Sequence, residues 1–185
     1  TRMSRLDSTA FYEACAAGET AEASHREVVG AVKNALGETD CVAAATTLAR
    51  TEQLNLSETG ISTLQPLTGL NKLQMLTITG NEISDLSPVS SMTSLTTLIA
   101  NQNQISDLSP VSGLTALDQL QVGTNQISDL TPISGMTGLT WLNLHNNQLT
   151  SLGALANLTK LLNLKLSNNQ LTELREISNM PELMF

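Results

Sequence analysis

The sequence has 185 residues, 41% hydrophobic but only 2% aromatic, which is enough for one domain or one short repeat array with an aliphatic core. A net charge of −8 leaves no basic stripe to neutralise phosphates, so we expect no nucleic-acid partner and little attraction to anionic membranes. No apolar run approaches the roughly 18 residues that a membrane span needs, so we expect no membrane insertion.

The first segment, up to about residue 49, has apolar residues at helical spacing, as in Val28, Val32 and Leu36. Candidate helix starts are Asp7-Ser8-Thr9, Glu19-Thr20 and Thr39-Asp40, and candidate stops are Gly18 and Gly37. We therefore predict three short helices. They would cover the open edge of a first strand near Leu54 and Leu56, which would otherwise invite aggregation.

The two cysteines of the chain, Cys15 and Cys41, both lie in this helical segment. Their spacing fits no C-x-x-C pattern, and with only two histidines a structural zinc site has too few ligands. The alternatives are a disulfide and two buried free thiols, of which we favour the disulfide. A disulfide would indicate an oxidising compartment, such as the periplasm, the cell surface or the outside.

A repeat of 22 residues begins near Leu48. It aligns two columns of residues, which are Asn81, Asn103, Asn125, Asn147 and Asn169, and Leu54, Leu76, Leu98, Leu120, Leu142 and Leu164. Six full repeats reach Met180 and a partial seventh follows. The sequence thus divides into a helical cap, residues 1–49, and a repeat region, residues 50–185.

Within one repeat, Leu76 and Ile78 alternate with outward polar or Met positions, which predicts a short strand with one buried face. Asn81 follows where its amide can satisfy the backbone of its own turn and of the next layer.

The other side of each repeat reads Ser or Thr followed by Pro, at Ser87, Ser109 and Thr131. We predict that these residues are N-caps, with the proline at the first position of a short, 3₁₀-type turn. The fold class is then an α/β repeat solenoid with short parallel strands on a concave face, 3₁₀ turns on the convex side and a helical N-terminal cap.

The consensus L-x-x-L-x-x-L-x-L-x-x-N-x-I-S-D-L-S-P-V, with tandem copies at Ile83, Ile105 and Ile127, resembles the bacterial internalin type of leucine-rich repeat. The segment before the repeats is similar in placement to the helical cap of that family. The resemblance implies a horseshoe fold and a secreted or surface-held adhesion or invasion factor that grips a host protein with its concave face.

Catalytic chemistry is not expected, because no nucleophile elbow, zinc-protease motif, phosphate loop or dinucleotide fingerprint is present. His25 lies near Glu22 and Glu27, a pattern more typical of a solvated helix face than of a dyad. Asp85, Asp107 and Asp129 form a column that could attract Ca²⁺, but we favour a role as backbone acceptors at the turn. We expect no cofactor and no metal site.

The outward strand positions are where function is expected. Met75, Ile99 and Trp141 are apolar on a face that has no structural need for them, and Trp is enriched at interface hot spots. We predict that Trp141 is largely exposed. The candidate partner-binding residues are Met75, Ile99, Gln119, Gln121, Trp141, Asn143, His145 and Lys165.

The C-terminal layer is predicted to be an uncapped edge that leaves its apolar residues poorly covered, which are Ile177, Met180, Leu183, Met184 and Phe185. We expect either further repeats or a cap beyond it, or a homodimer that buries two such ends against each other.

The function that fits these features is a non-enzymatic recognition module with a protein partner, such as a host or cell-envelope protein. Two alternatives stay open at this point. One is an intracellular scaffold of the 22-residue-repeat, phosphatase-binding type, and the other is the recognition segment of a larger enzyme.

Overall fold

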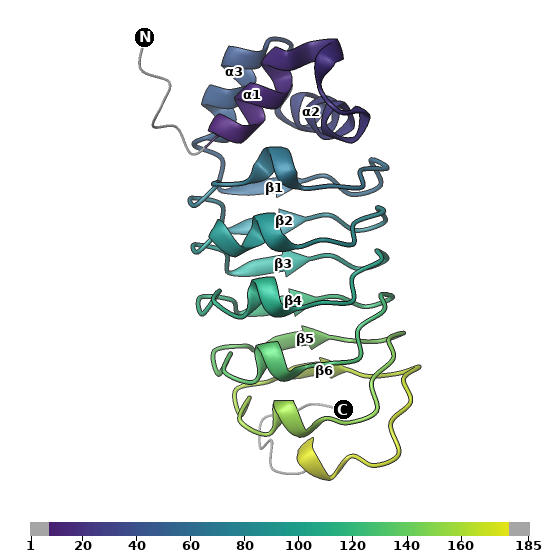
Figure 1. Cartoon of the computed structure of the whole chain (residues 1–185). Coiled ribbons are helices and arrows are strands. Elements are labelled where there is room, and N and C mark those ends of the chain that lie inside the picture. The colour runs from purple at the N-terminus through teal and green to yellow at the C-terminus, as the bar shows by residue number, and fades with distance from the viewer. Residues whose placement is uncertain (1–7, 178–185) are drawn as a thin grey trace.

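Three helices precede the first strand in residues 8–177, the part of the chain that this computed structural model describes (Figure 1). They are α1 (Thr9–Ala17), α2 (Ala23–Leu36) and α3 (Cys41–Leu48), with a 3₁₀ turn, η1 (Gly18–Thr20), between the first two. Gly18 and Gly37 end α1 and α2 as predicted, and Gly37 has the left-handed φ of 70° that suits glycine at a helix end.

Of the predicted helix starts, the one at Asp40 is confirmed and the one at Glu19-Thr20 is not. Asp40 caps α3, because its Oδ1 accepts the backbone N–H groups of Val42 and Ala43, both at 2.9 Å. The predicted second start at Glu19-Thr20 is wrong. Helix α2 begins at Ala23, since residues 18–20 form their own 3₁₀ turn and Glu22 is extended before the helix.

The helices cover the first strand, as predicted. Phe11, Val28 and Val32 are fully buried and belong to the same core cluster as Leu54 and Leu56. Figure 1 shows the three helices above β1 at one end of the stack. The apolar edge of the first layer is therefore covered by the apolar faces of the helices, not by solvent.

Cys15 in α1 and Cys41 in α3 form a disulfide, with their Cα atoms 5.7 Å apart. A second tie between the same helices is the hydrogen bond from the buried Ser8 hydroxyl to the Ala45 carbonyl, at 2.7 Å. The structure thus supports the disulfide over two free thiols, and the bond links the first helix to the third.

The repeats supply six parallel strands in one sheet, in chain order (Figure 1). These are β1 (Gln53–Asn55), β2 (Met75–Thr77), β3 (Thr97–Ile99), β4 (Gln119–Gln121), β5 (Trp141–Asn143) and β6 (Asn163–Lys165). Each residue pairs with the one 22 positions later, for example Leu54 with Leu76 and Leu76 with Leu98. The predicted solenoid and its register are confirmed.

The core of the stack consists of aliphatic columns. Leu76 and Ile78 are fully buried and point inward, as the alternation predicted. The same positions in the next layers hold Leu98 with Ala100 and Leu120 with Val122, and all are fully buried. Burial of such side chains from layer to layer is the main stabilising term of the stack.

The asparagine column ties neighbouring layers together. The Asn81 Nδ2 donates to the Leu56 carbonyl of the layer before at 2.8 Å and to the Ile78 carbonyl of its own layer at 3.0 Å. Its Oδ1 accepts the Ile61 N–H at 3.2 Å. One amide therefore satisfies buried backbone groups on both sides of a layer boundary, which confirms its structural role.

The convex side carries short 3₁₀ turns, as predicted. They are η2 (Gln65–Leu67), η3 (Ser87–Ser91), η4 (Ser109–Val111), η5 (Thr131–Ile133), η6 (Gly153–Leu155) and η7 (Arg175–Ile177). Their predicted N-caps are wrong, because Ser87, Ser109 and Thr131 lie inside the turns and the preceding leucines make no side-chain cap.

The capping group is instead the aspartate two residues earlier. Asp85 accepts the Ser87 N–H at 2.7 Å, and Asp107 and Asp129 accept the equivalent groups at 2.8 Å. The predicted role of the three aspartates as backbone acceptors at the turn is thus confirmed, although the hydroxyls do not act as the predicted N-caps.

Of the predicted poorly covered layer, Met180, Leu183, Met184 and Phe185 lie outside the described residues. Ile177 is buried, at 5% exposure, so the prediction is wrong for that residue. Within residues 8–177, no helix is long and apolar enough to cross a membrane.

Candidate binding face

The outward side chains of the six strands form what we call the concave face. It comprises three rows, which are Gln53, Met75, Thr97, Gln119, Trp141 and Asn163, then Asn55, Thr77, Ile99, Gln121, Asn143 and Lys165, then Ser57, Thr79, Asn101, Gly123, His145 and Ser167. The parallel register places the members of each row side by side, about 4.8 Å apart.

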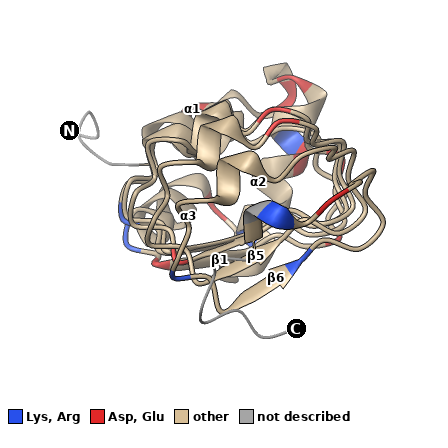
Figure 2. Ribbon diagram, turned by 90° about the horizontal axis from the view of Figure 1, so that it is seen from below, with Lys and Arg blue, Asp and Glu red and all other residues tan. Residues whose placement is uncertain are grey.

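The concave face holds no carboxylate, although the chain has 17 acidic residues. Its charged side chain is Lys165 in β6, which is exposed; the blue part of β6 in Figure 2 marks it. His145 is the other titratable group in the three rows. Acidic and basic residues are otherwise carried by the helices, the loops and the convex turns, so the face is nearly neutral.

Some outward residues are less exposed than the sequence suggested. Thr97 and Asn143 are buried, at 6% and 5% exposure. Met75, Ile99, Gln119, Gln121 and His145 are half-buried. The physical reason is that outward side chains of strands only about 4.8 Å apart cover one another.

The predicted large exposure of Trp141 is wrong. The side chain is half-buried, and its indole Nε1 is buried without a hydrogen-bond partner in the described structure. Gln119 and Asn163 flank it in register on β4 and β6. Part of the indole, including Nε1, is therefore shielded from water, while the rest of the side chain stays accessible.

A chain of hydrogen bonds connects the third row with the second. The Oδ1 of Asn143 lies 2.7 Å from Nδ1 of His145, and the Nδ2 of Asn143 donates to Oδ1 of Asn101 at 3.3 Å. The Nε2 of His145 lies 3.2 Å from the hydroxyl of Thr124. The backbone N–H of Gly123 also donates to the Asn101 Oδ1, at 2.8 Å.

Gly123 makes room for the imidazole of His145. A Cβ at residue 123 would stand 2.2 Å from Nδ1 and 2.3 Å from Cε1 of that ring. Atoms do not approach so closely, so the ring can lie where it does because residue 123 has no side chain. The sequence predicted that residues 123 and 145 both point outward, but not that the His145 ring needs the space left by Gly123. The 22-residue offset, which makes the two residues neighbours, could have suggested it.

A cavity of about 440 Å³ lies at the end of the concave face next to the helices. Ala35 and Leu36 of α2 form one side, and Gln53, Asn55 and Met75 are among the strand residues on the other. Sequence reasoning found Met75 but not the α2 residues, since the approach of α2 to β1 is a tertiary contact. The candidate face therefore extends onto the cap.

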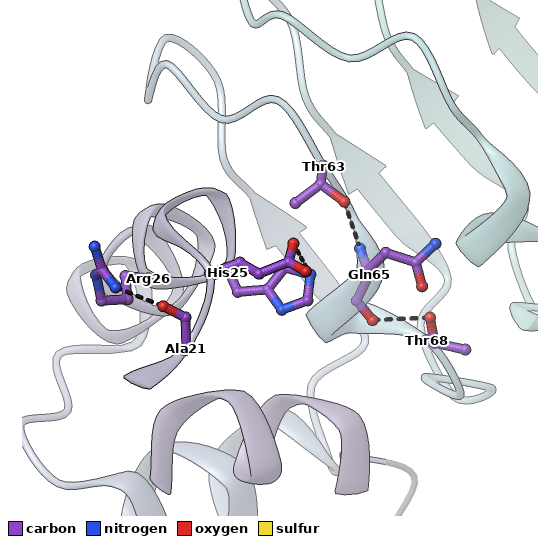
Figure 3. A network of polar contacts seen from close by, with 7 residues as sticks. Ala21, His25, Arg26, Thr63, Gln65 and Thr68 are labelled. Carbon is purple, nitrogen blue, oxygen red and sulfur yellow. Dashed lines mark hydrogen bonds and ion pairs between the residues drawn. The ribbon is translucent and has the colours of Figure 1, made fainter. Parts of the chain in front are cut away.

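The remaining candidates for chemistry are structural. The Nε2 of His25 lies 3.9 Å from the Glu22 carboxylate, which is largely exposed, so the pair is part of a solvated surface of α2 (Figure 3). The neighbouring Arg26 donates to the Ala21 and Glu19 carbonyls and holds η1 against α2. Among residues 8–177, no group of three or more His, Cys, Asp or Glu side chains is placed to hold a metal ion.

Hydrogen bonds lower the pKa of two convex aspartates. The hydroxyl and then the backbone N–H of Ser109 hold the pKa of Asp107 below its ordinary value, and Thr131 does the same for the pKa of Asp129. Both carboxylates are thus engaged with their own turns.

Comparison with known proteins identifies the repeat. Residues 93–135 and 137–183 match the family described as "Leucine Rich repeats (2 copies)". No curated protein sequence matches the chain. The fold and these matches make it a leucine-rich-repeat protein.

Two similar solved structures are internalins from Listeria monocytogenes. One, inlF, is 28% identical with a TM-score of 0.66, and the alignment covers 88% of this chain and 55% of that one. The other, internalin C2, is 25% identical with a TM-score of 0.63, over 86% of this chain and 91% of that one. These likenesses in sequence and fold support an internalin-like type of leucine-rich repeat.

A leucine-rich-repeat protein from Leptospira interrogans shares the fold at 20% identity and a TM-score of 0.69, over 88% of this chain and 45% of that one. The chain therefore spans about half the length of two of these three structures. Proteins of this fold are in general binding modules without enzymatic activity.

Proposed function

We propose that the chain is a recognition module that holds a protein partner on its concave face and acts outside the cell, at its surface or in the periplasm. The observation that carries the proposal is the concave face itself. It is a continuous surface of amides, hydroxyls and three apolar side chains, without a carboxylate, on a chain with a net charge of −8. Keeping every acidic group off one face favours contact with another macromolecule there.

The candidate contact residues are Met75, Ile99, Gln119, Gln121, Trp141, Asn143, His145 and Lys165. Asn143 is mostly covered, so it contributes by fixing His145 and not by direct contact. Half-buried residues such as Trp141 and Met75 are typical of anchors, because their positions are fixed before a partner arrives.

The flat area of six strands is small. A length of about five residues along each of the six strands gives a footprint of roughly 400 Å², about half of the share of one partner in a standard interface. The cavity between α2 and the first strands supplies part of the difference. The interface is thus proposed to include the cap around Leu36.

An extracellular location is supported by two observations. The Cys15–Cys41 bond fits an oxidising compartment and argues against the intracellular-scaffold alternative. The likeness to internalins implies secreted or surface-held proteins, and a role in adhesion or host interaction follows from that likeness.

The test introduces the same charge on two sides of the solenoid. The immobilised chain is used to capture a protein from candidate host and cell-envelope extracts, and the captured protein is identified and purified. Its affinity is then measured for the wild type, for Gln121→Arg on the concave face, and for Gln126→Arg, an exposed position beyond β4. We expect Gln121→Arg to weaken binding at least tenfold and Gln126→Arg to leave it unchanged. Equal affinities for both variants would refute the concave face as the binding surface.

A further inference from the structure

Strand β5 and the residues after it carry an unusual set of outward side chains. Trp141, Asn143 and His145 alternate along one side of the chain, so two ring-bearing side chains flank an amide. The chain has one Trp, one Tyr, two Phe and two His in total. In so aromatic-poor a sequence, one ring on β5 and a second two residues beyond its end form a distinct feature of the candidate face.

The His145 ring is fixed in orientation. The backbone N–H of residue 145 donates to the Asn143 Oδ1 at 3.2 Å. A carboxamide oxygen can only accept, so Nδ1 of His145, at 2.7 Å from it, carries a hydrogen in this contact. The other ring nitrogen, Nε2, lies 3.2 Å from the Thr124 hydroxyl. Both edges of the ring are thus occupied within the protein.

The residues beside this ring fit its shape. Gly123 leaves the space that the ring fills. Thr124 follows with a φ of 55°, and the same left-handed turn recurs at this position of each layer, from Glu58 to Asn168. The backbone conformation therefore belongs to the repeat, and what is particular to this layer is the Thr124 hydroxyl beside the ring.

The side chains around the two rings offer unused hydrogen-bonding capacity. Gln119, Gln121 and Asn163 are half-buried on the face, and their side-chain amides bond to no other described residue. A carboxamide donates and accepts within one group. This is the combination that a ligand with many hydroxyl groups requires, because each hydroxyl also donates and accepts.

The charge of this region argues for an uncharged ligand. The outward residues of β4, β5 and β6 include Lys165 as their one permanently charged group, and no carboxylate. A single exposed cation is too little to select a polyanion, and the absence of acids leaves nothing to pair with basic groups. The recognition that remains is stacking on rings and hydrogen bonding to neutral groups.

We propose that the β4–β6 part of the concave face binds a neutral oligosaccharide carried by the macromolecular partner. The accessible surfaces of Trp141 and His145 contact the apolar C–H faces of the sugar rings. The amides of Gln119, Gln121 and Asn163 bond the sugar hydroxyls. This inference rests on the proposed function, since it names what the same face recognises on its partner.

The single tryptophan provides the assay. The fluorescence of Trp141 is followed while neutral oligosaccharides of glucose, galactose, mannose and N-acetylglucosamine, and uronic-acid oligosaccharides of the same length, are added to the full chain. We expect a saturable change in emission with at least one neutral series, at the same affinity in low and high salt. A response to the acidic series alone, lost in high salt, would overturn the inference.

Two glycine variants locate the site. Gly123→Ala places a methyl group where the His145 ring lies, and we expect at least a tenfold loss of affinity by calorimetry. Gly135→Ala is the matched control, because a Cβ there meets no atom within 4 Å. If Gly123→Ala does not fold, His145→Ala takes its place. Equal affinities of the wild type and of the folded variant at this site would overturn the assignment.

The failure of this inference is distinguishable from the failure of the proposed function. If no oligosaccharide binds, and a captured protein loses affinity with Gln121→Arg but not after enzymatic removal of its glycans, the oligosaccharide inference is wrong and the proposed function stands. If Gln121→Arg and Gln126→Arg bind the captured protein equally and no oligosaccharide binds, both are wrong.

Discussion

Replacing Asn147 by alanine tests the asparagine ladder. The Oδ1 of Asn147 accepts the Ile127 N–H at 2.9 Å, and its Nδ2 donates to the Val122 and Leu144 carbonyls at 3.0 and 3.1 Å. The residue is 8% exposed, so water cannot replace these partners freely. Its removal leaves the Ile127 N–H without this acceptor. It also takes one hydrogen bond from each of the two carbonyls, which keep the amides of Asn125 and Asn169, and a longer one from the His145 carbonyl.

The magnitude follows from these contacts. An unsatisfied buried donor costs about 1–3 kcal/mol, and each of the other lost hydrogen bonds about 1 kcal/mol, so we expect a loss of roughly 3–5 kcal/mol. Urea unfolding followed by circular dichroism measures it. With a slope of about 2 kcal/mol per molar urea, the midpoint should fall by roughly 2 M.

The control is Gln148→Ala, one residue later. Its side chain is exposed and bonds to no described residue, so its effect should stay within about 0.5 kcal/mol. If Asn147→Ala lowers the free energy of unfolding by less than about 1 kcal/mol, at an unchanged dependence on urea, the asparagine ladder does not stabilise the fold and core packing alone determines the stability.

Three further outcomes are expected. Emission from Trp141 in the free protein should be blue-shifted relative to a fully hydrated indole, because its Nε1 is buried; a maximum at the fully exposed position would contradict the burial described above. Reduction of the Cys15–Cys41 bond should raise the mass of the chain by two hydrogens, and alkylation of two thiols before reduction would disprove the bond. Loss of the bond should lower the free energy of unfolding by about 3–4 kcal/mol by the chain-entropy relation. Because the pKa of Asp107 is lowered in the folded chain, this carboxylate stabilises the fold at a pH above the ordinary pKa of 3.8, and the stabilisation is lost as the pH falls through the folded pKa. Ser109→Ala should raise the folded pKa of Asp107 in a carboxyl NMR titration. An unchanged pKa would exclude the Ser109 hydroxyl as the cause of the shift.

The fold was largely predictable because a repeat supplies the same information several times. The inward positions of Leu76 and Ile78 and the role of Asn81 recur at a fixed offset, so a pattern that is weak in one layer becomes decisive in the array. The division into a cap at residues 1–49 and repeats at 50–185 stays a prediction of the same kind.

Two predictions, the N-caps of the 3₁₀ turns and the start of α2, were wrong because more than one residue or structure fits the same sequence pattern. Both Ser87 and Asp85 are suited to accept backbone N–H groups at the start of a turn, and the sequence does not show which oxygen is nearer. Helix α2 was predicted to begin too early for a similar reason, since Glu19-Thr20 fits the first turn of a 3₁₀ segment as well as that of an α-helix.

The candidate site was the least predictable part. The exposure of Trp141 depends on how its indole leans on neighbouring strands, and the position of His145 depends on the missing side chain of Gly123 in the layer before. Such contacts join residues whose relation is visible only when the layers are stacked. The alternation of strand residues indicates the side to which a residue points, but not what lies over it.

The constant register also determines how this molecule can change in length. Each strand pairs only with its predecessor and successor, at an offset of 22 residues throughout the sheet. An insertion or deletion inside a strand would turn buried leucines toward water and break the ladder on both sides of the change, whereas a change in a surface loop leaves the register intact. Lineages of this protein should therefore gain or lose whole periods by duplication or excision within the gene, and each such step would widen or narrow the recognition surface by a strip of about 4.8 Å.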